Sequence, residues 1–533
     1  MLDSREEELG VKRDNTRKKK KEKRSEKKTI HKEEETEERR GEEEEEEEEG
    51  QQEKDSEGVL LRGIFKLGKK SQDVLLTRTR LTWIPITPET PTEPRVLHPE
   101  VLLLEDVFAV KVKRRRAAGQ QSGGPVLGLT LFHSRRKGRK LEEDTLHLHN
   151  ASSEHTYRWY NKIKELVTGF TIRPKFLKVF INPSSHKKEA VHIYRDHVAP
   201  LFKMADVRTD ITVTERTGHA LSVMKECKLD EYDGVLCVGG DGSVAELCHA
   251  LVLRAQLDTG SPEKPVNDVC LLLPLIFTGS TDVVSCSVHG VRDPVTAALH
   301  VILGHQQQVD MCSFTSLGQL VRYGFSAMFG FGGQSLARAE KNRWMSSSRR
   351  REYAMSFFHP HIIASFHLVF SCVVIVEEEE TWTTREGLYL NISIMSIPCL
   401  SPHAPQGLAP DTRYLQGGSA SLIAVGNTSR SEFIKHLKRY SFSFSFVETH
   451  TVSAVRVRPR SQTGWSEGEE NEEEEDSKTT PIIGSEGASF PWNIDGELVE
   501  IANEVLVRVH PRLITLYGEH IDEAETTASC SCI

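Results

Sequence analysis

The sequence predicts a multidomain protein: an antiparallel β-barrel module closed by a helix, then an α/β lobe, then a mainly antiparallel β lobe. Three observations support this. Short β-rich runs fill residues 58–150 and end in one amphipathic helix. Apolar strands alternate with helical patterns over residues 175–313, as in a doubly wound parallel sheet. After about Phe314 strand patterns dominate.

Composition narrows the functional classes. A chain of 533 residues has room for two or three domains, and its net charge of −9 argues against a dedicated, specific nucleic-acid binder. The ten cysteines form no CxxC pair and sit mostly in apolar runs, so we expect buried thiols in a reducing compartment. The first residues lack an apolar segment, which argues against a secretory signal.

Residues 1–56 are expected to form a disordered, charged tail. They contain a basic block around Lys18–Lys21 and an unbroken acidic run, Glu42–Glu49. Such blocks repel themselves and remain unfolded. The basic block fits a nuclear-import or anionic-surface patch as well as it fits a simple solvated tail.

Residues 57–170 are expected to form one module. Their β-rich runs are followed by SSEHTYRWYNKIKELVTGF, an amphipathic helix whose apolar positions lie on or near one face: Tyr157, Trp159, Tyr160, Ile163 and Leu166. Antiparallel strands closed by a Trp-bearing helix resemble a pleckstrin-homology (PH) domain, with Trp159 in the core. A PH-like module would contact membrane lipids.

A basic segment lies within this module. It consists of Lys111, Lys113, Arg114, Arg115 and Arg116. These cations could meet anionic lipid head groups, at about 1 kcal/mol per charge near such a surface. They could instead form a nuclear-import signal, or do neither.

The α/β domain is expected over residues 175–313, and the mainly β lobe over 314–518 with an acidic disordered insert at about 464–487 and a tail at 519–533. Met355–Val376 is apolar and long enough to span a bilayer. It contains Pro360 and three histidines, however, and its second half suits a buried strand. We therefore expect a strand there, with a membrane segment as the alternative.

The sharpest motif is Gly239-Gly240-Asp241-Gly242, between an apolar strand and a helix. Glycines let the backbone approach a phosphate closely, and a helix N-terminus presents N–H groups to an anion. Asp241 could hold Mg²⁺ or accept a proton from an attacking hydroxyl. The alternative is that the motif is an ordinary strand-to-helix turn, in which Asp241 only caps the helix.

Three further motifs stand in order around it: Asn182-Pro183, Gly279-Ser280-Thr281 and Asp495-Gly496-Glu497. The ordered set resembles the diacylglycerol-kinase catalytic family, which includes sphingosine and ceramide kinases. Other segments, among them HKKEA, FGFGG and EKNRWMS, are similar to the ceramide kinase-like proteins. The resemblance implies a two-lobed diacylglycerol-kinase fold: a doubly wound nucleotide lobe and an antiparallel β lobe.

The resemblance also implies roles for individual residues. Asp241 would be the general base that takes the lipid hydroxyl proton. Asp495 and Glu497 would contact the triphosphate and its Mg²⁺. The cofactor of an active enzyme would therefore be Mg·ATP. The remaining implied nucleotide contacts are Asn182, Thr214, Gly239, Gly240, Gly242, Glu246, Gly279, Ser280, Thr281, Arg343, Arg349 and Gly496.

The chain also departs from the family pattern. Active ceramide and sphingosine kinases carry glycines directly after Asn-Pro, whereas this chain continues with Ser184 to Glu189 and no glycine. Phe277 precedes the second phosphate turn, and Gln334 stands where ceramide kinase has an aspartate. Our hypothesis is a protein of sphingolipid regulation and stress (anti-apoptotic) protection with little or no ceramide kinase activity. An active ATP-dependent lipid kinase is the rival, and a plain interaction scaffold is a third reading.

The expected partners are membrane lipids, either ceramide and related sphingolipids or anionic phospholipids. Basic clusters indicate cytoplasm and nucleus, with the nucleolus as a further candidate, and the resemblance implies peripheral contact with endoplasmic reticulum or Golgi membranes. Cys530 lies four residues from the end, formally a prenylation pattern. The residues after it are not aliphatic, which favours a free tail.

Overall fold

The computed structural model forms two compact units, Met1–Leu104 and Glu105–Ile533. It describes residues 58–86, 98–120, 123–185, 188–260, 269–273, 275–277, 282–342, 366–376, 379–401, 404–409, 412, 415–439, 444–459, 490–501 and 504–522. The predicted tails and the acidic insert therefore lie outside the described residues, apart from Glu519–Asp522.

The first unit contains four antiparallel strands in chain order: β1 (Leu61–Leu67), β2 (Lys70–Leu76), β3 (Arg80–Pro85) and β4 (Glu100–Leu103). Burial alternates along β2, where Val74 and Leu76 are fully buried between half-buried neighbours. This period of two gives the sheet one apolar face.

The second unit begins with the antiparallel strands β5 (Val107–Arg114), β6 (Val126–Lys137) and β7 (Lys140–His149), followed by α2 (Ser153–Thr168). Ser152 caps α2 by accepting a hydrogen bond from the backbone N–H of His155. Trp159 is 1% exposed, as expected of a core residue, but the buried face of α2 runs through Thr156, Ile163 and Val167, and Tyr157 is exposed. The predicted antiparallel strands and closing helix are thus present, while the PH-like identity stays a prediction.

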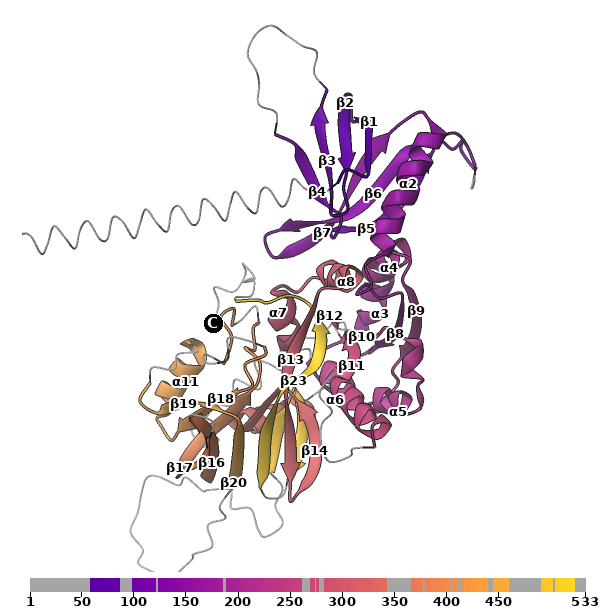
Figure 1. Cartoon of the computed structure of the whole chain (residues 1–533). Helices are drawn as coiled ribbons and strands as arrows, with labels where there is room; N and C mark the ends of the chain where they lie inside the picture. Colours follow the sequence, from indigo (N-terminus) through magenta and orange to yellow (C-terminus); the bar gives the residue numbers. More distant parts are fainter. Residues whose placement is uncertain are drawn as a thin grey trace, which may run out of the picture. The chain divides into compact units, whose positions relative to one another are not determined.

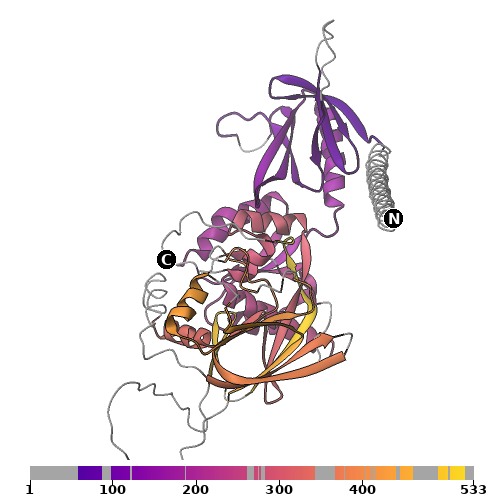
Figure 2. The ribbon, with the colours of Figure 1, turned by 90° about the vertical axis from the view of Figure 1, so that its left-hand side faces the viewer.

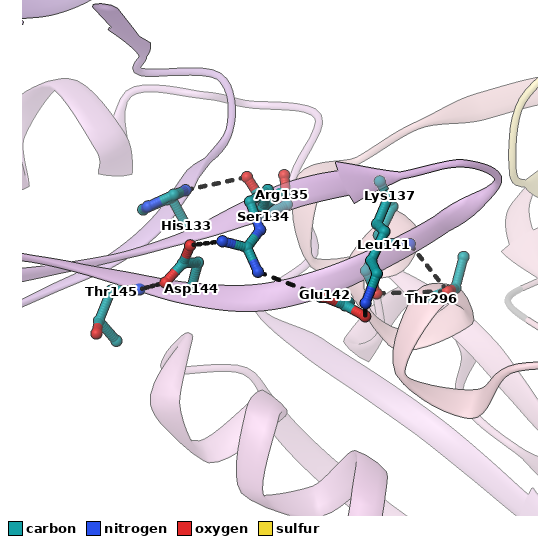
Figure 3. Close-up of polar contacts among 9 residues, drawn as sticks. All are labelled: His133, Ser134, Arg135, Lys137, Leu141, Glu142, Asp144, Thr145 and Thr296. Atoms are coloured by element: carbon teal, nitrogen blue, oxygen red, sulfur yellow. Dashed lines mark hydrogen bonds and ion pairs between the residues drawn. The ribbon is translucent and has the colours of Figure 1, made fainter. Parts of the chain in front are cut away.

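The tip of the β6–β7 hairpin contacts α8 (Pro294–Leu303) of the α/β lobe (Figure 3). The backbone N–H of Leu141 donates to Thr296 Oγ1 at 3.0 Å, and the same hydroxyl donates back to the Leu141 carbonyl at 3.4 Å. Next to it, both terminal nitrogens of Arg136 donate to the Glu519 carboxylate at 2.7 Å. Polar contacts therefore attach this hairpin to the lobe behind it.

The α/β lobe contains the parallel strands β8 (Phe176–Ile181), β9 (Arg208–Val213), β10 (Gly234–Gly239), β11 (Val269–Leu273) and β12 (Leu275–Phe277). Strand β8 lies between β9 and β10, and β11 and β12 both pair with β10. The helices that connect them are α3 (Ala190–Ile193), the π-helical turn η2 (Tyr194–Val198), α4 (Ala199–Met204), α5 (His219–Glu226), the 3₁₀ turn η3 (Leu229–Glu231), α6 (Asp241–Asp258), α7 (Val283–His289) and α8.

Both faces of this sheet are covered, as a doubly wound fold requires. Val235 and Cys237 of β10 share a core with α5 and α6. Leu236 and Val238, which alternate with them, pack with residues of α4 and α8. The prediction of a doubly wound parallel lobe is therefore confirmed.

The remaining strands form an antiparallel, open half-barrel (Figure 2). They are β13 (Gln306–Ser316), β14 (Gln319–Gly324), β15 (Ser326–Gly330), β16 (Phe366–Val376), β17 (Glu379–Met395), β18 (Ala420–Gly426), β19 (Val447–Val452), β20 (Ala454–Pro459), β21 (Phe490–Ile494), β22 (Glu497–Ile501) and β23 (Val505–Tyr517), with α9 (Phe331–Lys341) and α11 (Arg430–Arg439). Strand β15 ends at Gly330, and α9 begins at the next residue, Phe331.

Strand β23 joins the two lobes (Figure 1). Its first half pairs antiparallel with β20 and β13, for example Val507 with Val455. Its second half continues alongside β13 and also pairs parallel with β11, where Ile514 faces Val269. One strand therefore belongs to both sheets, and the lobes share a backbone hydrogen-bond network.

The second half of the apolar stretch Met355–Val376 forms the predicted strand, β16, and its first half lies outside the described residues. Leu368, Phe370 and Cys372 of β16 are buried in the core of the half-barrel. Among the helices that the structure describes, none combines the length and apolar character needed to cross a membrane.

Candidate functional site

A cavity of about 360 Å³ opens at the carboxyl ends of β8, β9 and β10. This edge is where ligands bind in open α/β sheets, because the strand-to-helix turns gather there. The predicted residues that line it are Asn182, Thr214, Gly240, Gly242, Glu246, Gly496 and Glu497. The structure thus brings the first, second and last of the sequence motifs to one place.

The glycine turn after β10 is tightly packed. A Cβ at Gly239 would lie 2.6 Å from Ser243 Cβ and 2.8 Å from Ser243 Oγ, so no side chain fits without a shift. The Asn182 side-chain amide donates to that same Ser243 hydroxyl at 2.9 Å, which ties the Asn-Pro turn to the glycine turn. Gly240 is the N-cap residue of α6 and makes no side-chain cap bond, so first-turn N–H groups of α6 remain available at the cavity.

Asp241 is the first residue of α6, but its carboxylate bonds to a different helix. Its Oδ1 accepts a hydrogen bond from the backbone N–H of Val284 in α7 at 3.2 Å. Burial, with a further contribution from the nearby Asp282 carboxylate, raises the pKa of Asp241 to about 7. Asp282 itself is 2% exposed and paired with Arg292 at 2.7 Å. A carboxyl group with this pKa can exchange a proton near neutrality.

Asp495 and Glu497 lie in different environments although they belong to one turn. Asp495 is 5% exposed, and its two carboxylate oxygens accept hydrogen bonds from the N–H groups of Phe325 (2.9 Å) and Ser326 (2.8 Å). Burial raises the pKa of Asp495, and the nearby Arg322 opposes this rise. Glu497 lines the cavity, and its carboxylate is ion-paired with Arg322.

The turn that follows β8 carries side chains throughout, with no glycine between Ser184 and Glu189. Ser184 and Ser185 line the cavity. Lys188 has a φ of 74°, in the left-handed region where a side chain costs about 1–2 kcal/mol. A glycine would adopt this backbone conformation without that cost.

Sequence reasoning missed four polar residues that line the cavity: Glu215, Arg216, Thr217 and Ser243. The first three directly follow Thr214, at the end of β9, and their position after a parallel strand was the signal that could have found them. With Glu246 and Glu497, the described lining has three carboxylates and one cation, Arg216.

Several predicted site residues cannot be placed at the cavity. Gly279, Ser280, Thr281, Arg343 and Arg349 lie outside the described residues.

The basic segment lies elsewhere, on β5 and the loop that follows it. There Arg114 donates to the Gly124 carbonyl at 2.8 Å and to the Tyr157 hydroxyl, while Arg115 and Arg116 are exposed. Its binding role stays a prediction.

Comparison with known proteins identifies the family. Residues 177–314 match the diacylglycerol kinase catalytic domain, and residues 325–358 and 373–533 match the ceramide kinase C-terminal domain. The human ceramide kinase-like protein is 45% identical over 521 residues, which cover 88% of this chain and 92% of that protein. The chain belongs to the ceramide kinase and diacylglycerol kinase family.

Two further proteins are similar to this chain. Human ceramide kinase is 31% identical over 417 residues, 68% of this chain and 77% of that protein. A solved diacylglycerol kinase from Bacillus anthracis superimposes with a TM-score of 0.42 and 12% identity, over 65% of this chain and 97% of that one. The predicted family is confirmed. The roles of individual site residues, the domain boundaries and the cellular location remain predictions.

Proposed function

We propose that this protein of the lipid kinase family has little or no ceramide kinase activity and takes part in sphingolipid regulation and stress (anti-apoptotic) protection. It would bind nucleotide weakly and act through membrane lipids or protein partners. The observation that carries the proposal is the charge of the cavity, where three carboxylates and one cation line the described wall.

This charge balance opposes the binding of a nucleoside triphosphate. Phosphoryl transfer depends on positive groups and Mg²⁺ that neutralise the phosphate oxygens. Glu215 and Glu246 repel those oxygens, and Arg216 can offset only one negative charge. Glu497 is already paired with Arg322, so this arginine is not available to a phosphate.

The turn after β8 adds a steric reason. The side chains of Ser184 and Ser185 occupy part of the cavity wall where bare backbone would approach a nucleotide. Lys188 keeps a strained backbone conformation in the same turn. Both features weaken a phosphate contact that depends on backbone N–H groups.

An active ATP-dependent lipid kinase remains the second candidate, and Asp241 is the observation that favours it. With a pKa of about 7, its carboxylate could take the proton of a lipid hydroxyl at neutral pH. In such an enzyme, backbone N–H groups of Gly240–Gly242 would hold the phosphates. Glu497 and Glu246 have the oxygen donors that Mg²⁺ prefers, and they line the same cavity. Bound Mg·ATP would supply the phosphoryl group and the charge neutralisation.

Labelled-phosphate transfer from Mg·ATP decides between the two. The acceptors are ceramide, sphingosine and diacylglycerol in mixed micelles, and Asp241→Asn is the matched control. We expect no transfer above the Asp241→Asn background. Transfer to any acceptor that disappears in Asp241→Asn would overturn the proposal and identify the substrate.

The proposed location is the cytoplasm and nucleus, with peripheral binding to endoplasmic reticulum or Golgi membranes. Arg115 and Arg116 directly follow the last residue of β5 and are exposed to solvent, which supports this location. A fluorescent fusion in which Arg114–Arg116 are changed to glutamine should lose membrane and nuclear signal. An unchanged distribution would exclude this segment as the targeting signal.

A further inference from the structure

A second cavity, again about 360 Å³, lies on the opposite side of β8 and β9 from α5 and α6. Its walls come from β5, the last turns of α2, the connecting segment Phe170–Lys175, the α4–β9 junction Met204–Arg208, and Ile302 of α8. Figure 1 shows α2 and α4 next to each other at this place. This second cavity shares no lining residue with the cavity at the carboxyl ends of β8, β9 and β10.

The inner wall of this junction cavity is apolar. Phe108, Val110, Val167, Val207 and Ile302 are each less than 10% exposed and line it. An open space with such a wall suits an aliphatic chain, and its volume is within the usual range for small-molecule sites, about 300–1,000 Å³.

The rim carries positive charge. Lys164, Arg173, Lys175 and Arg208 line the cavity against a single carboxylate, Asp206. Within the described residues, no ion pair engages the three exposed cations Lys164, Lys175 and Arg208. Such unpaired cations above an apolar wall are complementary to an amphiphile with an anionic head.

Arg173 provides a second, independent observation. Its Nη1 donates to the Val107 carbonyl at 2.6 Å, and its Nη2 donates to the Glu105 carbonyl at 2.5 Å. Its guanidinium carbon lies 4.2 Å from the centre of the Phe170 ring. Its Nε is buried and has no hydrogen-bond partner in the part of the chain that the structure describes. A buried donor without a partner costs free energy that an anionic oxygen would recover.

We propose that the junction cavity binds one molecule of a single-chain lipid phosphate, with the chain against the apolar wall and the phosphate among Lys164, Arg173 and Lys175. Phosphate accepts several charge-assisted hydrogen bonds at once, which suits a rim with lysine and arginine together. A bound lipid would touch both α2 and β9, so it would fasten the helix that closes the β5–β7 strands to the α/β lobe. The site does not depend on whether the chain transfers phosphate.

Calorimetry on the full chain tests this with dodecyl phosphate, kept below its micelle concentration. We expect saturable binding of one molecule. Inorganic phosphate, which lacks the chain, and decyl maltoside, which lacks the charge, should each bind at least about tenfold more weakly. Equal binding of inorganic phosphate, or no saturable binding of dodecyl phosphate, would overturn the proposal.

Two variants and a matched control locate the site. Lys164→Gln/Lys175→Gln should weaken dodecyl phosphate binding by about tenfold or more, because two rim charges are lost. Lys225→Gln/Lys341→Gln removes two exposed lysines from α5 and α9 and should leave the affinity within about twofold of the parent, because screened charges far from a site contribute little. An equal loss in both pairs would show that net charge, not this cavity, controls binding.

A blocking variant tests the apolar wall separately. Ala205→Trp fills the cavity without changing charge, and it should abolish binding while the protein still unfolds cooperatively on heating. If this variant does not fold, the lysine pairs decide the question.

A last experiment uses vesicles of phosphatidylcholine with phosphatidate. Binding to vesicles alone, with none to monomeric dodecyl phosphate, would assign these cations to a membrane surface and overturn the proposal.

Discussion

Arg322 of β14 and Glu497 of β22 form an ion pair across 175 positions of sequence, next to the cavity at the carboxyl ends of β8, β9 and β10. The arginine side chain is only 9% exposed, and the glutamate side chain is 33% exposed. A Cβ at Gly242 would lie 3.5 Å from Glu497 Cγ. The pair therefore fixes the late acidic turn against the glycine turn.

Breaking this pair from the glutamate side should destabilise the protein. Glu497→Gln leaves a buried guanidinium without its counter-charge, and we expect the free energy of unfolding to fall by about 2 kcal/mol. Arg322→Met/Glu497→Gln should recover part of this loss, because no unpaired charge remains. Urea unfolding measures the stability of the single and the double variant. The control is Glu432→Gln, which breaks the exposed Glu432–Lys435 pair and should change the free energy of unfolding by less than about 0.5 kcal/mol. Equal effects of Glu497→Gln and Glu432→Gln would contradict this view of the pair.

The pKa of Asp241 makes stability depend on pH. The folded state raises this pKa from 3.8 to about 7, so between these values it holds a proton that the unfolded chain releases. The stability linked to this proton is complete below about pH 4 and is lost as the pH rises to about 7. Asp241→Asn cannot ionise, so its free energy of unfolding relative to the parent should rise by about 2–3 kcal/mol between pH 5 and pH 8.

Urea unfolding at the two pH values checks this prediction, with the exposed Asp230→Asn as the matched control. A difference between Asp241→Asn and parent that is the same at pH 5 and pH 8 would show that Asp241 ionises normally.

Gly239 should not tolerate a methyl group. Gly239→Ala places its Cβ against Ser243, and we expect a loss of about 2 kcal/mol in unfolding free energy. Gly239→Ala/Ser243→Gly removes the atoms that clash, so the two changes together should cost about 1 kcal/mol less than the sum of the single changes. Additive effects in this cycle would place the strain elsewhere in the turn.

Lys188→Gly should stabilise the turn after β8. The left-handed backbone at this position costs less for glycine, and the gain, reduced by the greater entropy of the unfolded chain, should be about 0.5 kcal/mol. Glu189→Gly, at a φ of −95°, is the neighbouring control and should destabilise the protein.

The same Lys188 variant should bind Mg·ATP more tightly in equilibrium dialysis if side chains in this turn limit nucleotide binding. Destabilisation by Lys188→Gly would contradict the view that the backbone of Lys188 is strained.

Local patterns predicted much of the α/β lobe. The glycine turn lies between β10 and α6 as expected, because a buried apolar run followed by glycines leaves few other conformations. The strand in the second half of Met355–Val376 was also recognisable from its valines and isoleucine.

Other features depend on contacts between distant segments, which local patterns do not contain. Asp241 lies in the predicted turn, but its bond to Val284 depends on how α7 packs. Asp495 and Glu497 are two residues apart, yet only the pairing of β14, β15, β21 and β22 turns one toward the Phe325 and Ser326 amides and the other toward Arg322. In α2, Tyr157 has an apolar ring but lies on the exposed side, where Arg114 contacts it.

The position of β23 has a consequence for synthesis on the ribosome. This strand is made after all the other described strands, yet it lies between β20 and β11 near the middle of the sheet. Until it emerges, β11, β13 and β20 expose backbone edges that can pair with other chains. Nascent chains that stop before Val505 should therefore need chaperones to remain soluble, and neither lobe should complete its folding before translation passes Tyr517.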